Sequence, residues 1–378
     1  MKLAILTFHK AFNCGAALQA WALRTVLERM GHSVEFPDCN TVGVETRIQM
    51  EWNRWPKSFL KKLRSLCFRV LRNILSIPGE DLKRYRFARF RKTYLPERIC
   101  SPSDFVQHYD AIVVGSDQVW SARHSREEAS LFFVENIDSS LPKLTYAASY
   151  GDKPLEGEVL ERVIVSAKRF NALSAREKVV KDQIEPPSGK SIEVVLDPTL
   201  LLTAEEYAPL ISKFTPPKEP YLFMYTLYTE PFYIETAKLL AKALGVKAII
   251  LPMCQFSRLF APKGLTYGIS PDRMVGYIAN AKYVLAGSFH GTAFATIFKK
   301  PFLSLRDQPE DLNALSRPGT LLKLTGNLDR IVTPETTIEE MLQRLQAPIV
   351  DNGALDVARA ESKAWLEQAL SSRATIES

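Results

Sequence analysis

The residues most able to do chemistry lie within 283–302. An apolar strand ends at Gly287 and a helix of small residues begins at Gly291, with Ser288 and His290 in the turn between them. Such a turn directs unpaired backbone N–H groups and the positive end of the helix dipole at one point, which suits a phosphate or a carboxylate. A histidine at that point can deliver a proton to the bound anion. The alternative is that His290 caps the helix or fills the turn.

A second junction of this kind follows the apolar run at 111–114, which reads as a buried strand. Gly115, Ser116 and Asp117 form its turn. Open α/β sheets bind ligands at the carboxyl ends of their strands, so these side chains are expected to line a cleft.

The chain opens with a third junction. A strand predicted at 2–7 leads through Asn13 and Gly15 into a helix that runs to Met30. Asn-x-Gly is also an ordinary turn signal, so both residues could simply shape the loop. Three polar, glycine-containing junctions together predict one cleft lined by strand ends.

Six short motifs resemble those of the polysaccharide pyruvyltransferase family. They are NCGAALQAWAL from Asn13, GSDQVW from Gly115, YAASYG from Tyr146, SARE from Ser174, LDPT from Leu196 and SFHGTAFA from Ser288. The motifs occur in the same order as in the family, and they span most of the chain from residue 1 to about 305. The resemblance implies an α/β fold of two Rossmann-like lobes that face a cleft, as in GT-B glycosyltransferases. It also implies transfer of the enolpyruvyl unit of phosphoenolpyruvate to a sugar as a pyruvate ketal, in cell-surface polysaccharide biosynthesis.

One position departs from the family's pattern. Many members carry Arg two residues before the motif histidine, where this chain has Ser288. One contact to the acidic groups of the donor must therefore come from elsewhere, and Arg176 and Arg306 are the candidates.

The implied reaction needs a proton for the vinyl carbon, stabilisation of the resulting cationic centre, and removal of a proton from the attacking hydroxyl. We assign donor contact and general acid to His290, and the base to Asp117. An Asp in such a turn is as commonly an N-cap, here over Val119 and Trp120. Neither a metal nor a cofactor is expected, since phosphoenolpyruvate is itself the donor substrate.

Arg176 is assigned to clamping the donor, because its planar fork suits a carboxylate or a phosphate. Its alternative is a helix-face arginine paired with Glu177 or Asp182. His9 is close in sequence to the first loop. The other predicted substrate-binding residues are Ser288, Gly291, Thr292, Ser116, Asn13, Gly15 and Tyr150. Tyr150 follows a strand predicted at 143–149 and could equally be a loop tyrosine on the surface.

The elements that position these residues divide into two series of strands and helices. We predict a first lobe at 1–210 and, after the proline-rich stretch 215–220, a second lobe at 221–345. The second lobe is predicted to contain strands 221–227, 247–251 and 283–286 and helices 231–244 and 271–280. A helix within 350–378 is expected to pack back on the first lobe, as in the resembled architecture.

Composition agrees with an ordinary globular protein. The chain has 378 residues, of which 46% are hydrophobic, enough for two domains with cores of their own. Its five cysteines are widely spaced and odd in number, which supports neither a zinc site nor a disulfide scaffold. No signal-peptide pattern opens the sequence, so a cytoplasmic location is expected.

The positive charge is concentrated in one segment. Residues 47–92 contain fourteen Lys or Arg and three Asp or Glu, a local net charge of +11 against +7 for the whole chain. Within it, apolar residues from Phe59 to Leu75 recur at helical spacing, preceded by Trp52 and Trp55. This pattern is typical of a helix at an anionic membrane surface, where a polyprenyl-diphosphate-linked acceptor would be found. A helix packed on the core with a basic rim is the alternative, whereas no nucleic-acid module is recognised.

Two rival functions remain open. One is a GT-B glycosyltransferase that uses a nucleotide-sugar, and the other is a non-enzymatic basic protein that binds a membrane surface or nucleic acid. We predict an enzyme at the inner face of the membrane, and the sequence leaves the oligomeric state and the acceptor sugar undetermined.

Overall fold

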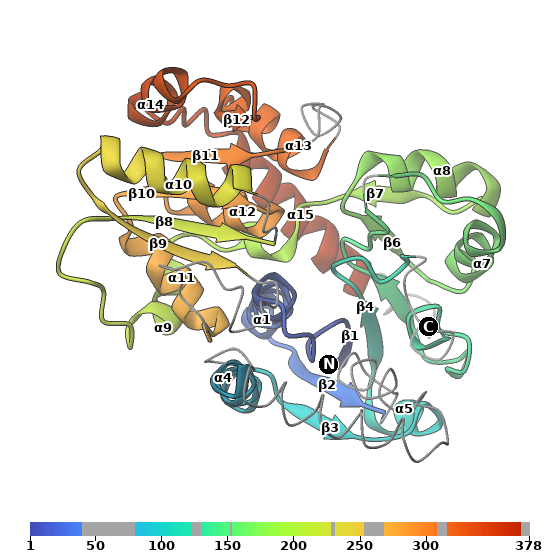
Figure 1. The fold of residues 1–378 in the computed structure, drawn as a ribbon. Coiled ribbons are helices and arrows are strands. Elements are labelled where there is room, and N and C mark those ends of the chain that lie inside the picture. The colour runs from blue at the N-terminus through green and yellow to red at the C-terminus, as the bar shows by residue number, and fades with distance from the viewer. Residues whose placement is uncertain are drawn as a thin grey trace, which may run out of the picture.

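The computed structural model describes residues 1–39, 80–121, 130–151, 153–227, 231–252, 268–307 and 316–371. The described residues form two five-stranded parallel sheets with helices packed around them, which confirms the predicted α/β fold (Figure 1). Most of the predicted basic amphipathic segment, residues 47–79, lies outside the described ranges.

The first sheet has the strand order β3-β2-β1-β4-β5. Its strands are β1 (Lys2–Leu6), β2 (Ser33–Asp38), β3 (Glu97–Ile99), β4 (Ala111–Val114) and β5 (Lys143–Thr145), and a parallel pair, β6 (Leu173–Ala175) and β7 (Ile192–Val194), continues beside β5. The helices of this half are α1 (Cys14–Arg29), α4 (Glu80–Tyr94), α5 (Phe105–His108), α7 (Gly157–Ala167) and α8 (Lys178–Ser188). Strand order reverses between β1 and β4, so their carboxyl ends form a topological switch point.

The strand predicted at 143–149 is shorter than expected. It ends at Thr145 because the backbone of Ala147 has a positive φ of 49°, which breaks the extended conformation. Ala148 then bridges both Asp117 and Ala175, so the chain still connects the turn after β4 to the end of β6.

The second sheet has the order β12-β11-β10-β8-β9. Its strands are β8 (Tyr221–Thr226), β9 (Lys247–Pro252), β10 (Tyr283–Gly287), β11 (Phe302–Leu305) and β12 (Ile331–Val332), and its helices are α10 (Pro231–Ala243), α11 (Pro271–Asn280), α12 (Phe289–Ile297), α13 (Arg317–Leu324) and α14 (Ile338–Gln346). Here the order reverses between β8 and β10, where Thr226 pairs with Gly287. His290 therefore follows the switch point of the second sheet, as Ser116 and Asp117 follow that of the first.

Short helical turns and the last helix connect the two halves. The turns are η2 (Pro198–Leu201), η3 (Glu205–Tyr207) and α9 (Ala208–Ile211), and the last helix is α15 (Ala354–Ser371). α15 lies between the two sheets (Figure 1), where Arg359 Nε donates to Leu200 O at 2.9 Å and Leu196 N donates to Ser362 Oγ at 3.0 Å. The C-terminal helix thus packs on elements that precede residue 210.

A shared core fixes α1 against α12. Tyr207 is fully buried, with its ring 5.4 Å from that of Trp21 in α1 and 5.2 Å from that of Phe294 in α12. Both contacts stabilise by the area removed from water, and the contact between Tyr207 and Phe294 adds an edge-to-face geometry. The amino-terminal ends of α1 and α12 are consequently held in fixed relation to each other.

Candidate active site

His290 lies in the first turn of α12. Ser288 is the N-cap, and its Oγ accepts a hydrogen bond of 3.0 Å from the N–H of Gly291. The helix therefore begins at Phe289, and the expectation that it begins at Gly291 with His290 in the preceding turn is wrong, because the serine hydroxyl supplies the cap two residues earlier. His290 is buried, with 11% of its side-chain surface still exposed.

The first turn of α1 lies directly against the His290 ring. A Cβ atom added at Gly15 would be 2.1 Å from His290 Nδ1, far inside van der Waals contact. Asn13 caps α1 by accepting from Gly15 N at 2.8 Å and from Ala16 N at 3.4 Å. The predicted turn residues therefore serve separate purposes: Asn13 starts the helix, and Gly15 makes room for the histidine. The positive ends of two helix dipoles meet at this ring.

Asp197 is the centre of the buried charges around His290. It is 1% exposed, and its Oδ2 lies 3.7 Å from His290 Nε2 and 2.8 Å from Arg176 Nη1. Its Oδ1 accepts from the N–H and the hydroxyl of Thr199 at 2.9 and 2.7 Å. Burial alone would raise the pKa of Asp197, but His290, Arg176 and Thr199 hold that pKa well below its usual range.

Sequence reasoning missed Asp197, although it quoted the motif that contains it. Asp-Pro after a strand is most often an N-cap, and Asp197 does cap η2. No local sequence signal marks its other role, because its partner Arg176 lies 21 residues away in the sequence.

Arg176 follows β6 and does not lie on a helix face. Its Nε contacts Glu177 Oε1 at 2.8 Å and its Nη2 donates to Ser149 Oγ at 3.2 Å. The alternative pairing with Glu177 is present, whereas Asp182 pairs with Lys178 instead, at 2.6 Å. Since every nitrogen of this guanidinium has a protein partner, we expect Arg176 to orient its carboxylates as well as to supply charge.

Ser116 and Asp117 join the same cluster from the turn after β4. Ser116 Oγ donates to Asp197 Oδ2 at 3.4 Å, and Asp117 Oδ1 lies 3.8 Å from Arg176 Nη2. The N-cap alternative for Asp117 is wrong: residues 118–121 form a turn, and Val119 donates to the backbone carbonyl of Asp117, at 2.8 Å. Asp117 retains 18% of its side-chain surface and is thus more accessible than Asp197.

The hydroxyls of Thr292 and Tyr150 are bonded outside this cluster. Thr292 Oγ1 contacts Ser304 Oγ at 2.9 Å, and the Tyr150 hydroxyl donates to Val179 O at 2.9 Å and lies 2.6 Å from Gln183 Oε1. Both anchor neighbouring elements, so their substrate-binding roles stay predictions without a structural basis. Gly291 permits close packing of α12, since an added Cβ would be 3.1 Å from Ala286 Cβ.

His9 lies in the loop after β1 and is also buried. Burial lowers the pKa of His9 to about 4, so the ring is neutral at pH 7, and its Nδ1 lies 3.1 Å from Thr7 O. The 3.5 Å approach of its Nε2 to Glu97 is therefore not an ion pair at neutral pH.

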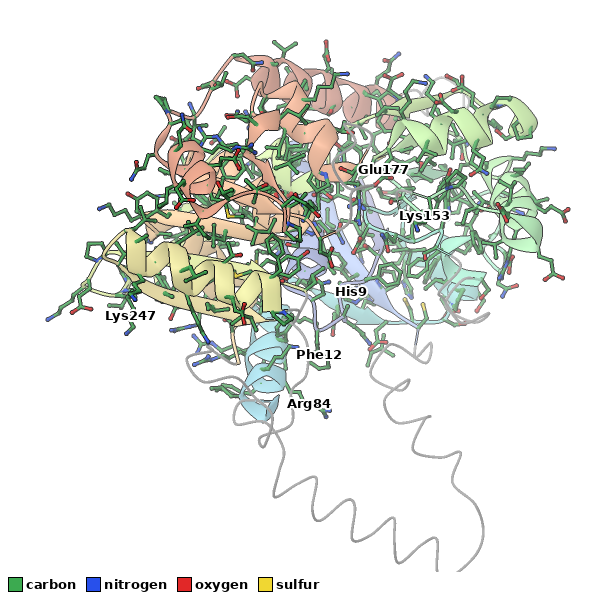
Figure 2. All side chains as sticks on the ribbon, turned by 45° about the horizontal axis from the view of Figure 1, so that its top comes forward. His9, Phe12, Arg84, Lys153, Glu177 and Lys247 are labelled. Atoms are coloured by element: carbon green, nitrogen blue, oxygen red, sulfur yellow. The ribbon has the colours of Figure 1, made fainter. Side chains whose placement is uncertain are left out.

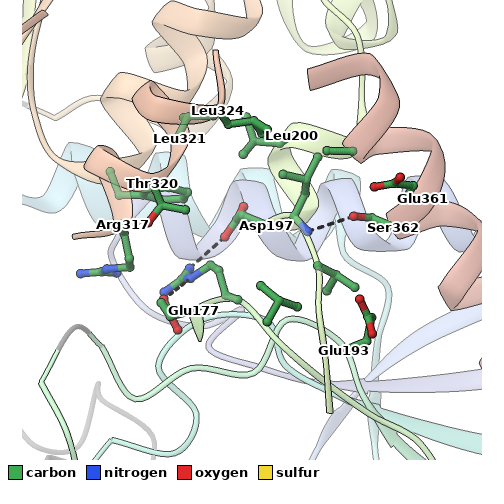
Figure 3. Close-up of a pocket in the computed structure, with 16 residues that line it drawn as sticks. Glu177, Glu193, Asp197, Leu200, Arg317, Thr320, Leu321, Leu324, Glu361 and Ser362 are labelled. Carbon is green, nitrogen blue, oxygen red and sulfur yellow. Dashed lines mark hydrogen bonds and ion pairs between the residues drawn. The ribbon is translucent and has the colours of Figure 1, made fainter. Parts of the chain in front are cut away.

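A cavity of about 280 Å³ lies beside the charged cluster, between β7, α13 and α15 (Figure 3). Arg176, Asp197 and Phe289 form part of its wall, and Arg317 enters from α13. Figure 2 shows Glu177 at the boundary between the two halves. Its Oε2 is buried and has no hydrogen-bond partner among the described residues, and burial raises the pKa of Glu177 despite the charges of Arg176 and Arg317. The cavity thus presents an unsatisfied acceptor together with the cation of Arg317.

Arg306 and Arg317 bring further positive charge from the second half. Arg306 is buried directly after β11, where its Nη1 donates to Leu305 O at 2.8 Å, and Arg317 is the first residue of α13. The sequence names Arg306 as a source of a donor contact, and that role stays a prediction. Within the described ranges, no three His, Cys, Asp or Glu side chains are grouped to hold a metal ion, and no helix is long and apolar enough to cross a membrane.

Comparison with known families gives one match. The model of the family described as polysaccharide pyruvyl transferase matches residues 13–309. No curated protein matches the sequence.

Several solved structures share the fold at low sequence identity. A candidate UDP-N-acetylglucosamine 2-epimerase from Listeria monocytogenes is 11% identical with a TM-score of 0.52, over 98% of this chain and 96% of that one. UDP-GlcNAc 2-epimerase from Neisseria meningitidis, bound to UDP-GlcNAc, is 12% identical with a TM-score of 0.50, over 97% and 99%. The spinosyn forosaminyltransferase SpnP is 10% identical with a TM-score of 0.42, over 97% and 95%. The two epimerase similarities place the chain in the GT-B-like fold.

Proposed function

Because the chain belongs to the polysaccharide pyruvyl transferase family, we propose that it transfers the enolpyruvyl group of phosphoenolpyruvate to a sugar and closes it into a pyruvate ketal. The observation that carries the proposal is the placement of His290 between the amino-terminal ends of α1 and α12, with the ionised Asp197 behind it. Two helix N-termini favour a bound anion, and a histidine beside that anion can act as its general acid.

The reaction balances without a redox partner or an added group. A proton reaches the methylene carbon of phosphoenolpyruvate, which becomes a methyl group, and one sugar hydroxyl oxygen bonds to the adjacent carbon. A second hydroxyl of the same sugar then bonds to that carbon, and the bond between the carbon and the phosphate oxygen breaks. One of the two hydroxyl protons restores the proton that the general acid gave to the methyl group. The other leaves with inorganic phosphate.

Each charged group has a role that follows from its surroundings. His290 delivers the proton, and Asp197, whose pKa is held low, stays ionised and stabilises the imidazolium form instead of donating a proton itself. Asp117 is the base for the attacking hydroxyl, since it is less buried and less tightly paired than Asp197. Arg317 and Arg306, with Arg176, balance the phosphate and carboxylate of the donor.

We further propose that the acceptor sugar is carried on a polyprenyl diphosphate at the inner face of the membrane. The support is the net charge of +11 over residues 47–92, which favours an anionic surface. Cytoplasmic location and peripheral attachment belong to this proposal.

Product analysis tests the reaction directly. Release of inorganic phosphate from phosphoenolpyruvate that depends on added acceptor supports pyruvyl transfer. Release of a nucleoside diphosphate from a nucleotide-sugar, with no phosphate from phosphoenolpyruvate, would instead identify a glycosyltransferase. Phosphoenolpyruvate should also raise the melting temperature more than any nucleotide-sugar in a panel, because a ligand that binds only the folded state stabilises it.

A further inference from the structure

A second pocket, of about 210 Å³, lies between the two halves and is lined by four cations. Arg86 and Arg89 come from α4 of the first half, Arg273 from α11 of the second, and Lys213 from the segment after α9. We call it the cationic pocket. Asp272 is the one acidic residue among the described residues that line it, so positive charge exceeds negative charge by three.

Two of the four cations are held in place on the pocket wall by contacts of their guanidinium groups. Arg86, Arg89 and Thr93 recur at helical spacing, so one face of α4 forms this wall. Arg86 Nη1 donates to Gly268 O at 2.5 Å, while the Arg273 guanidinium lies 5.6 Å from the Phe214 ring and 5.9 Å from the Tyr277 ring. Stacking and hydrogen bonding therefore fix two guanidinium groups that approach from opposite halves of the molecule.

Bringing these guanidinium groups together has an electrostatic cost. Burial and the neighbouring charge of Arg273 both lower the pKa of Arg86, and Asp272 only partly offsets them. Like charges near a protein surface repel one another, and an anion bound between them would offset this repulsion by attraction to each. Guanidinium and ammonium groups that converge from several elements are the donors that phosphate oxygens accept.

The cationic pocket adjoins the start of α1. Phe12 packs on α4, with its ring 5.6 Å from that of Phe87, and Figure 2 shows Phe12 beside this helix. Cys14 begins α1 next to Gly15; burial raises the pKa of its thiol to about 12, with smaller opposing contributions from the charges of Lys83 and Asp272. α11, which carries Asp272 and Arg273, packs against α1, the helix whose first turn touches His290.

We propose that the cationic pocket binds a phosphate or diphosphate group. Resting on the proposed function, we assign that group to the diphosphate of a lipid-linked acceptor, held between the halves while the sugar reaches His290. This site is separate from the one that holds the donor, because none of the residues that line it belongs to the His290 cluster.

Titration of the full chain with sodium pyrophosphate, followed by calorimetry, tests the pocket without requiring turnover. We expect wild-type protein to bind, and the double variant Arg89→Glu with Lys213→Glu to bind at least tenfold more weakly. Lys92→Glu is the matched control, since it reverses a charge on the same helix outside the pocket. His290→Gln should bind as wild type does, which separates this pocket from the donor site.

Wild-type affinity in the double variant, or no binding by the wild type, would overturn the proposal. If the double variant fails to fold, the neutral pair Arg89→Gln with Lys213→Gln replaces it. Sedimentation with phosphatidylglycerol vesicles separates the two sources of phosphate. If the double variant loses vesicle binding while its pyrophosphate affinity equals that of the wild type, these cations contact a bilayer and do not form this pocket's binding site. In the double variant, a tenfold rise in KM for a diphosphate-linked acceptor, with the KM for an unlinked sugar unchanged, supports the assignment to the acceptor. An equal change in KM for the two acceptors refutes it.

Discussion

Gly15→Ala is the most informative single substitution, because it adds one carbon where the structure has no room. The new Cβ would be 2.1 Å from His290 Nδ1, whereas such atoms rest about 3.5 Å apart, so the ring must move by more than about 1 Å. A misplacement of that size typically costs about a hundredfold in rate, equivalent to about 2.7 kcal/mol of activation free energy. We expect kcat for phosphate release to fall by at least that factor.

The free energy of unfolding should fall as well, because a buried site is overpacked. Alanine is favoured over glycine in a helix by about 1 kcal/mol, which offsets part of the clash. Gly276→Ala in α11 is the control: its Cβ would be 2.4 Å from Phe214 Cγ, an overlap of similar size away from His290. It should lower the melting temperature, as overpacking does, while the folded protein keeps its kcat with an unlinked sugar acceptor, because Phe214 lines the cationic pocket and not the His290 cluster.

A double-mutant cycle decides whether the histidine is the reason. In a His290→Ala background the ring is absent, so Gly15→Ala should cost nothing further. Independent, multiplicative losses from the two substitutions would refute the reasoning, as would near-normal turnover in Gly15→Ala alone.

Three further predictions follow from the buried charges. Asp197→Asn keeps the shape of the side chain but removes the charge that stabilises the imidazolium, so kcat should fall by about a hundredfold or more. The melting temperature should also drop because Arg176 loses a buried counterion, and unchanged kcat would remove Asp197 from the mechanism. Arg176→Lys should weaken phosphoenolpyruvate binding and lower stability although the charge is kept, since one ammonium cannot reach the partners of a planar fork; donor affinity equal to wild type, measured by titration, would leave Arg176 a purely structural role. Burial lowers the pKa of His9 from 6.5 to about 4, so its neutral form contributes about 3 kcal/mol of stability that is fully present above pH 6.5 and is lost as the pH falls to 4; His9→Gln should flatten denaturant-measured stability across that window, and an unchanged slope would contradict the assignment.

The sequence predicts β8, β9, β10, α10 and α11 closely, because the strands are continuous apolar runs, whereas it gives no bounds for β11, β12, α13 and α14. Every residue of β8 is buried, which gives a clear pattern, and α11 begins and ends where its proline and asparagine predict. The errors have local causes. The Ser288 hydroxyl starts α12 before Gly291, and the left-handed backbone of Ala147 shortens β5, neither of which follows from hydrophobic periodicity.

The candidate site is predictable only in part for a different reason. Strand-to-helix junctions identify Ser116, Asp117 and His290 as neighbours of strand ends, and the structure brings them together. Asp197 and the fit of Gly15 against the histidine ring depend on contacts between segments far apart in the chain. No local pattern encodes such contacts, so they required the three-dimensional arrangement.

The central claim is that His290 protonates the vinyl carbon of phosphoenolpyruvate during ketal formation. Running the reaction in heavy water and analysing the product by mass spectrometry and NMR tests it most directly. We expect one deuterium in the methyl group of the sugar ketal, together with equimolar inorganic phosphate, and at least a hundredfold slower formation of that product by folded His290→Gln protein. A product that keeps its vinyl hydrogens, or labelled ketal formed at the wild-type rate by the variant, would contradict the account.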